Sequence, residues 1–168
     1  MGVLGIYLLF VGITLVINGV NRFYKQIDAK SMAIMNAITG VIIVLGSFIN
    51  FSKGVATFDF MNVAAGFLFG FTYIFIASNH LFKLDWRPFG WFSLFVTAFA
   101  VYMAVLSAQD GDWKFVYLWT AWAALWLNGF LDIVTGIKSM GKIFPYLSIA
   151  EGIAAAFVPA LMMLTDKW

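Results

Sequence analysis

Long apolar runs alternate with short polar breaks along the whole chain. A helix needs about 20 apolar residues to cross a hydrocarbon core of roughly 30 Å, and the runs have about that length. The residues of Val41–Leu45 do not alternate in polarity, as strands of a membrane β-barrel would. The pattern predicts an all-α integral membrane protein with six transmembrane helices. We expect these over Val3–Asn21, Ser31–Phe51, Phe60–Phe82, Pro88–Gln109, Trp113–Ile137 and Ile143–Leu164.

The prolines indicate where two of these helices begin. Pro88 and Pro145 stand at the predicted starts of the fourth and sixth helices, where a missing N–H is harmless. Pro159 lies inside the sixth run and predicts a local kink.

A weak internal repeat suggests how the helices are arranged. Asn18, Asn79 and Asn128 each fall in the second half of an odd-numbered run. This repeat would suit three hairpins around a central pore, with the odd-numbered helices lining it.

Basic residues are distributed unevenly between the two ends of the predicted helices. Cytoplasmic loops are enriched in Lys and Arg, so the richer end is expected inside the cell and both termini outside. The first run lacks the flanks of a signal peptide and is expected to remain as a span. The breaks after the first, third and fifth runs carry Arg22, Lys25, Lys30, Lys83, Arg87, Lys138 and Lys142, against Lys53, Lys114 and Lys167 elsewhere.

Composition agrees with the membrane prediction and excludes several functions. Of the 168 residues, 63% are hydrophobic and 11% charged, whereas soluble domains are about 25% charged. We treat residues 1–168 as a single six-helix transmembrane domain. A net charge of +2 without a basic stripe gives no reason to expect a nucleic-acid partner. With no cysteine and one histidine, we expect no metal site and no cofactor.

An aromatic stripe is the first candidate for function. Trp119, Trp122 and Trp126 fall within an arc of about 60° on one helix, at midspan rather than at the interface. Phe69 and Tyr73 lie four residues apart and near midspan of the third run. Such a stripe fills space between packed helices or lines a path for a solute, and the pattern alone leaves both interpretations open.

Three titratable residues lie within or near the membrane. Glu151 is placed about 10 Å inside the sixth run, where an acid is costly and usually functional, although a structural pair with an Asn or a backbone group stays open. Asp132 lies nearer the boundary and would snorkel or pair with Lys138 or Lys142. His80 is expected to act as a hydrogen-bonded cap.

Aromatic walls with few hydrogen-bonding groups suit a narrow pore for small, planar, neutral solutes such as urea and amides. A proton-coupled transporter that uses Glu151 or Asp132 is the alternative. A structural assembly protein also stays open, with the stripe as packing. No nucleophile lies beside a suitable base at matching depth, so we do not expect an enzyme.

Several motifs resemble the bacterial urea and short-chain amide channel family (AmiS/UreI). The most specific is the Leu-Asp-Trp-Arg-Pro block. The matching segments are Gly5–Gly19, Gly66–Tyr73, Asn79–His80, Leu84–Pro88, Ser93–Val96, Gly111–Trp113, Trp119–Leu127 and Ile149–Ile153.

The resemblance implies a passive channel in the bacterial cytoplasmic membrane, with a pore through each six-helix protomer. It also implies a lipid-embedded homo-oligomeric ring, hexameric in the urea-channel branch. The substrates would be urea or short-chain aliphatic amides such as acetamide. Carried over by position, the pore-lining residues are Leu4, Leu8, Val11, Leu15, Phe69, Tyr73, Trp119, Trp122, Leu125, Trp126 and the carboxylate Glu151.

The outer breaks depart from the acid-gated branch of the family. That branch has long outer loops with histidines, whereas the breaks at Ser52–Asp59 and Gln109–Asp112 are short and contain none. Histidine is the usual titrating switch near neutral pH. We therefore expect a channel that is not gated by outer histidines, either an amide channel or an ungated urea channel.

Overall fold

The computed structural model describes residues 2–53 and 57–168, and their backbone is helical apart from short turns. The last three elements run on as one continuous rod over residues 138–164, so the described residues form six rods. The elements are α1 (Gly2–Tyr24), α2 (Ala29–Phe51), α3 (Thr57–Phe82), α4 (Arg87–Gln109), α5 (Trp113–Ile133), α6 (Lys138–Glu151), the π-helix η1 (Gly152–Phe157) and α7 (Val158–Leu164).

The all-α membrane prediction is confirmed at the level of helices and hydropathy. Among the described residues, five helices are long and apolar enough to cross a membrane. The predicted fifth span is not among these five. The α5 helix has 21 residues, but its mean hydropathy is lower than that of the other five. Its sequence holds Lys114, Asn128 and Asp132 beside several tryptophans, which are less hydrophobic than leucine or isoleucine.

Helix boundaries follow local chemistry, with one correction. Asp28 caps α2 by accepting hydrogen bonds from the backbone N–H groups of Lys30 and Ser31 at 2.9 and 3.1 Å. Pro88 lies in the first turn of α4, as predicted. The expectation for Pro145 was wrong, because the sixth rod begins at Lys138 and Pro145 lies inside α6. Basic and small residues before Pro145 extend the helix despite their low hydropathy.

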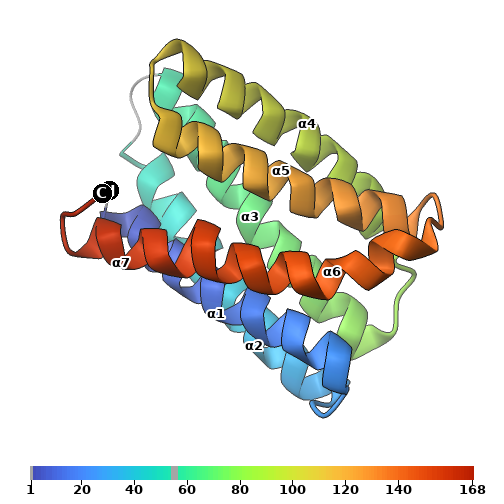
Figure 1. Ribbon diagram of the computed structural model, residues 1–168. Helices are drawn as coiled ribbons and strands as arrows, with labels where there is room; N and C mark the ends of the chain where they lie inside the picture. Colours follow the sequence, from blue (N-terminus) through green and yellow to red (C-terminus); the bar gives the residue numbers. More distant parts are fainter. Residues whose placement is uncertain (1, 54–56) are drawn as a thin grey trace.

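Glycines allow the closest helix contacts, as is usual between membrane helices. A Cβ atom added to Gly12 would lie 2.7 Å from the carbonyl oxygen of Gly152, so α1 and η1 approach at backbone distance. Gly40 of α2 meets the carbonyl oxygen of Gly70 in α3 in the same way, at 2.8 Å. Figure 1 shows α1 alongside the α6–α7 rod and α4 alongside α5, so the rods associate in pairs.

Polar side chains join α1 to α2 in the interior. The hydroxyl oxygens of Thr14 and Thr39 lie 2.7 Å apart and share a hydrogen bond. One helical turn further, Asn18 and Asn36 each donate an amide N–H to the other's oxygen, at 3.1 and 3.0 Å. Because these polar groups bond to one another between the helices, none of them has to face lipid, which could not form hydrogen bonds with it.

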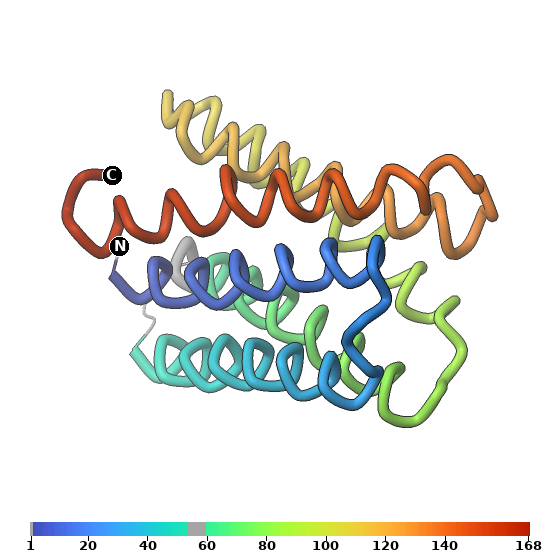
Figure 2. Tube along the Cα trace, turned by 60° about the horizontal axis from the view of Figure 1, so that its bottom comes forward, coloured from blue at the N-terminus to red at the C-terminus, as the bar shows by residue number. Residues whose placement is uncertain are grey.

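The odd-numbered helices do not approach one another closely. Among the described residues, the Cα atoms of α1, α3 and α5 stay more than 8 Å apart between helices, so contact between these helices is made by side chains. The two termini lie close together at one end of the bundle, as Figure 2 shows. We refer to this as the terminal end.

Candidate functional site

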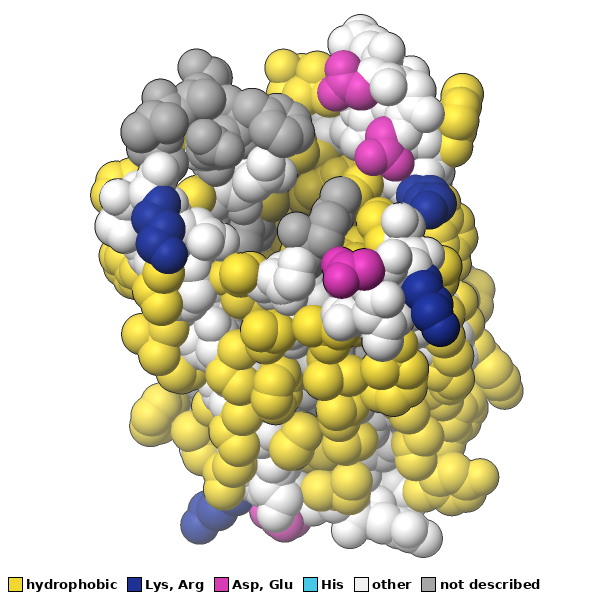
Figure 3. Space-filling view, turned by 90° about the vertical axis from the view of Figure 1, so that its left-hand side faces the viewer, with side chains coloured by type: hydrophobic (Ala, Val, Ile, Leu, Met, Phe, Trp, Pro, Cys, Tyr) yellow, Lys and Arg dark blue, Asp and Glu magenta, His cyan; other side chains and the backbone are white. Residues whose placement is uncertain are grey.

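A cavity of about 690 Å³ enters the bundle between the odd-numbered helices at the terminal end. Figure 3 faces this end and shows charged side chains around a hollow. The cavity is lined by Gly2, Val3, Leu4, Tyr7, Leu8, Val11, Asn50, Asn62, Ala65, Gly66, Phe69, Met103, Leu106, Ser107, Asp110, Asp112, Phe115, Trp119 and Trp122.

The cavity wall changes from polar to apolar with depth. The polar lining residues come from the ends of α2 and α4 and the beginnings of α3 and α5, next to the terminal end. They include Asn50, Asn62, Ser107 and Asp112. Deeper along α1, α3 and α5 the lining is aliphatic and aromatic. A solute entering the cavity therefore exchanges water for apolar contacts as it moves inward.

An aromatic cluster closes the inner end of the cavity. We use this name for Phe69, Trp119, Trp122 and Trp126. The Phe69 ring of α3 meets all three tryptophans of α5 edge-to-face, with centroid separations of 6.2, 4.8 and 4.7 Å. Edge-to-face packing is the favoured arrangement of aromatic rings. One ring from α3 thus bridges to three rings of α5, across helices whose backbones stay apart.

Hydrogen bonds fix the orientation of two of these tryptophans. Trp122 Nε1 donates to the carbonyl oxygen of Ala155 in η1 at 3.1 Å. Trp126 Nε1 donates to Thr72 Oγ1 of α3 at 3.2 Å. Thr72 Oγ1 in turn donates to the carbonyl oxygen of Leu68 at 2.8 Å. These bonds tie the tryptophans of α5 to two different neighbouring helices.

A second apolar cluster continues beyond Val11. It includes the buried residues Leu15 and Tyr73, with Leu125 packed against it. Glu151, the last residue of α6, is only 6% exposed, and among the described residues neither carboxylate oxygen has a hydrogen-bond partner. The next residue, Gly152, contacts Gly12 and Leu15 of α1, which places Glu151 beyond the cavity. Both oxygens could accept hydrogen bonds, but in this conformation they are closed to solvent.

The structure brings the predicted site residues to one region. Six of the eleven line the cavity: Leu4, Leu8, Val11, Phe69, Trp119 and Trp122. The others are not in its lining and lie further from the terminal end: Leu15, Tyr73, Leu125, Trp126 and Glu151. The predicted set therefore runs on from the cavity through the aromatic cluster.

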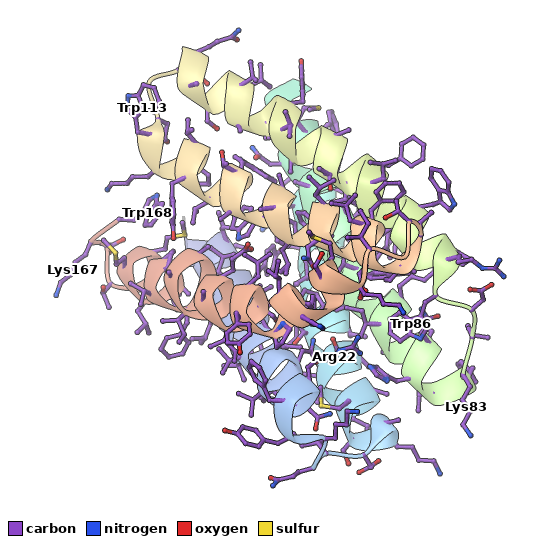
Figure 4. The ribbon with its side chains drawn as sticks, turned by 45° about the vertical axis from the view of Figure 1, so that its right-hand side comes forward. Arg22, Lys83, Trp86, Trp113, Lys167 and Trp168 are labelled. Carbon is purple, nitrogen blue, oxygen red and sulfur yellow. The ribbon has the colours of Figure 1, made fainter. Side chains whose placement is uncertain are left out.

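The two ends of the bundle carry the predicted charged and aromatic residues. Figure 4 places Trp113, Lys167 and Trp168 at the terminal end, with Arg22, Lys83 and Trp86 at the other end. The predicted outer break Ser52–Asp59 includes residues 54–56, which lie outside the described residues.

Two titratable residues lie apart from the aromatic cluster. The expected pairing of Asp132 with Lys138 or Lys142 is corrected, because Asp132 Oδ2 lies 3.9 Å from Arg22 Nη2 of α1. The α6 helix begins at Lys138 and brings Gly141, which has no side chain, against the Asp132 carboxylate. The His80 ring meets Trp86 edge-to-face at 5.3 Å. Among the described residues, no group of three His, Cys, Asp or Glu side chains could hold a metal ion.

Sequence reasoning missed three residues that support the site. Thr72 lies between Phe69 and Tyr73, and its spacing from Phe69 could have indicated a place on the same face. Met103 of α4 lines the cavity without any distinctive pattern around it. Ala155 acts through its backbone oxygen, so its side chain gives no signal.

Comparison with known proteins identifies relatives that match nearly the whole chain. The family model "AmiS/UreI family transporter" matches residues 3–167. The acid-activated urea channel of Helicobacter pylori (strain J99) is 36% identical over 196 residues, covering 98% of this chain and 99% of that protein. A putative amidate substrates transporter protein of Mycolicibacterium smegmatis is 30% identical over 166 residues, covering 98% and 78%.

Solved structures agree with this family match. The cryoEM structure of the Helicobacter pylori urea channel in a closed state superposes with a TM-score of 0.89, at 37% identity and with 98% of this chain and 99% of that chain covered. The crystal structure of the urea channel from Helicobacter pylori superposes with a TM-score of 0.86, at the same identity and coverage. These relatives are channels and transporters rather than enzymes. The resemblance read from the sequence is confirmed: the chain belongs to the AmiS/UreI family of membrane transporters.

Proposed function

We propose that this protein is a passive channel for small, neutral, planar amides. The substrates are urea or short-chain aliphatic amides such as acetamide. The observation that carries the proposal is the aromatic cluster at the inner end of an otherwise open cavity. Flat ring faces and edges contact a planar solute well, whereas a hydrated ion would lose its water there without replacement.

The path continues from the cavity through the aromatic cluster to the second apolar cluster and Glu151. Near Leu15 and Tyr73, the Glu151 carboxylate offers acceptors for the N–H₂ groups that urea and amides share. Few polar groups along the path keep binding weak, which a channel requires for rapid release. Relatives named for urea and for amidate substrates support this substrate class.

We further propose that the protein lies in the bacterial cytoplasmic membrane, with both termini outside. The distribution of basic residues between the two ends supports this orientation. Residues 1–168 act as a single domain with one pore per protomer, and the protomers form a lipid-embedded ring, hexameric as the family resemblance implies. The outer breaks contain no histidine, which supports a channel without a histidine gate.

The test is stopped-flow light scattering of liposomes that contain the purified protein, with urea and acetamide compared against empty liposomes. We expect entry of at least one solute to be faster than through lipid alone, without a proton or sodium gradient. Entry no faster than through empty liposomes, from folded protein, would contradict the channel. Uphill uptake that an uncoupler abolishes would favour the proton-coupled alternative that uses Glu151.

A further inference from the structure

The three tryptophans of α5 differ in how their indole N–H groups are used. Trp122 and Trp126 donate theirs to Ala155 and Thr72, as described above. Among the side chains that the structure describes, Trp119 Nε1 has no hydrogen-bond partner. Trp119 is 6% exposed and lines the cavity, so its ring is within reach of a solute there.

We infer that Trp119 Nε1 donates a hydrogen bond to the carbonyl oxygen of the permeating amide. The inference rests on the proposed function and names the group that selects for an acceptor oxygen. A solute that enters the apolar part of the cavity loses the water bound to its carbonyl oxygen. A donor at the inner end of the cavity replaces that water at the point where the path narrows.

The surroundings of Trp119 hold this donor in place. Its ring meets Phe69 and Phe99 edge-to-face, both at 6.2 Å, and Trp122 at 5.0 Å. Since three rings restrain the indole, little orientational freedom is lost when a solute binds. A donor already held in position binds its acceptor at a lower entropic cost than a mobile one.

Other polar groups of the cavity do not fit this role. Asn50 and Ser107 lie near the ends of α2 and α4, and Asn62 lies near the beginning of α3. All three are at the polar entrance of the cavity. The hydroxyl of Tyr7 is buried without a described partner and is closed to solvent. The Trp122 N–H is already bonded to Ala155. Trp119 therefore supplies the unpaired donor within the aromatic cluster.

The experiment compares urea with thiourea, whose sulfur is a weaker hydrogen-bond acceptor than oxygen. Permeabilities are measured by stopped flow in liposomes for the wild type, Trp119→Phe and the matched control Trp122→Phe. Both substitutions shorten a ring of the aromatic cluster, so both widen the path. Removing one neutral hydrogen bond corresponds to about a two- to tenfold change. We expect Trp122→Phe to lower the urea-to-thiourea ratio only as far as the widening does, and Trp119→Phe to lower it further by that factor.

The possible results separate the inference from the proposed function. A wild-type protein that conducts neither solute contradicts the proposed function. If the wild type conducts urea but both variants change the ratio equally, widening explains the effect and the inference is overturned. An unchanged ratio in Trp119→Phe overturns it as well.

A second measurement covers the case in which Trp119→Phe does not fold. Indole ¹⁵N–H resonances of the wild-type protein in nanodiscs are followed during titration with urea. The resonances of Trp122 and Trp126 are identified by their loss in the corresponding Phe variants. The chain has seven tryptophans, so the resonances of the other four, Trp86, Trp91, Trp113 and Trp168, are assigned in the same way. We expect the resonances of Trp122 and Trp126 to stay in place, while the remaining indole resonance, that of Trp119, shifts with urea and less with thiourea. Shifts of the Trp122 or Trp126 resonances, or no shift at all, would overturn the inference.

Discussion

Trp122 donates its indole N–H to the backbone oxygen of Ala155, four residues before Pro159. In an α-helix that oxygen would accept from the N–H of residue 159, which proline lacks. The π-helix η1 ends just before this proline, and the described chain turns back to α-helix at Val158. The proline thus leaves an acceptor available to a tryptophan of the aromatic cluster.

Replacing Pro159 with alanine should therefore loosen Trp122. The new N–H competes for the Ala155 oxygen, so the indole ring becomes more mobile and the cavity discriminates less between solutes. We expect a lower ratio of acetamide to butyramide permeability and a lower steady-state anisotropy of tryptophan fluorescence. Pro145→Ala is the matched control, since Pro145 lies inside α6 and away from the aromatic cluster. Equal effects of both variants would argue against a specific link to Trp122.

Thr72→Val removes the partner of Trp126 while keeping the shape of the side chain. The buried indole N–H would then lack an acceptor, which costs about 1–3 kcal/mol. We expect a lower free energy of unfolding in detergent and a lower urea permeability. Thr72→Ser keeps the hydroxyl and should behave more like the wild type. A Val variant as stable as the Ser variant would show that the bond contributes little.

Glu151→Gln keeps the size of the side chain and replaces one acceptor oxygen with an N–H₂ donor. If the Glu151 oxygens accept hydrogen bonds from the solute, we expect urea permeability to fall by about two- to tenfold, which corresponds to the loss of one neutral hydrogen bond. Asp132→Asn is the control, since Asp132 lies beside Arg22 and away from the aromatic cluster. Normal transport by the Gln variant would assign the carboxylate a structural role.

Acidification of the outer face should change transport little. The outer breaks carry no histidine, and His80 lies near the opposite end of the bundle, against Trp86. We expect urea permeability to vary by less than about twofold between external pH 7 and 5, because no unperturbed histidine titrates at that face. A steep rise on outer acidification alone would contradict this prediction.

Stability should fall at low pH through Asp28. The Ser31 hydroxyl, with help from backbone N–H groups, holds the pKa of this carboxyl below its ordinary value. A carboxyl whose pKa is lowered by folding stabilises the fold at pH values above its ordinary pKa. This contribution is lost as the pH falls through the pKa of the carboxyl in the folded protein. We expect thermal denaturation of the wild type to shift downward below about pH 4. The shift should shrink in Asp28→Asn, which still caps α2 but does not titrate.

The sequence predicted the helices and the aromatic residues of the candidate site because both depend on residue type and period, whereas the aliphatic residues of the first helix and Leu125 came only from the family resemblance. The lengths of the apolar runs located the six rods. The period of 3.6 residues placed Trp119, Trp122 and Trp126 on one face of a helix. The boundary of α6 was missed because hydropathy marks the apolar part of a helix, whereas the beginning of α6 contains Lys138, Ser139 and Lys142. The beginning at Lys138 could therefore not be read from Pro145.

Contacts between distant segments could not be predicted in the same way. The bond from Trp122 to Ala155 joins residues 33 apart and uses a backbone oxygen, which any residue would supply. The pairing of Asp132 with Arg22 depends on how α1 and α5 lie relative to each other. No periodicity within one helix contains that information.

The paired amides of Asn18 and Asn36, with the shared hydroxyl bond of Thr14 and Thr39 beside them, have a mechanical consequence. Sliding α1 along α2 would break several buried bonds at once, so the two helices should move as a rigid unit. The seam between α3 and α5 is different, because side chains alone bridge it. Any breathing motion that widens the path would therefore be concentrated along that seam.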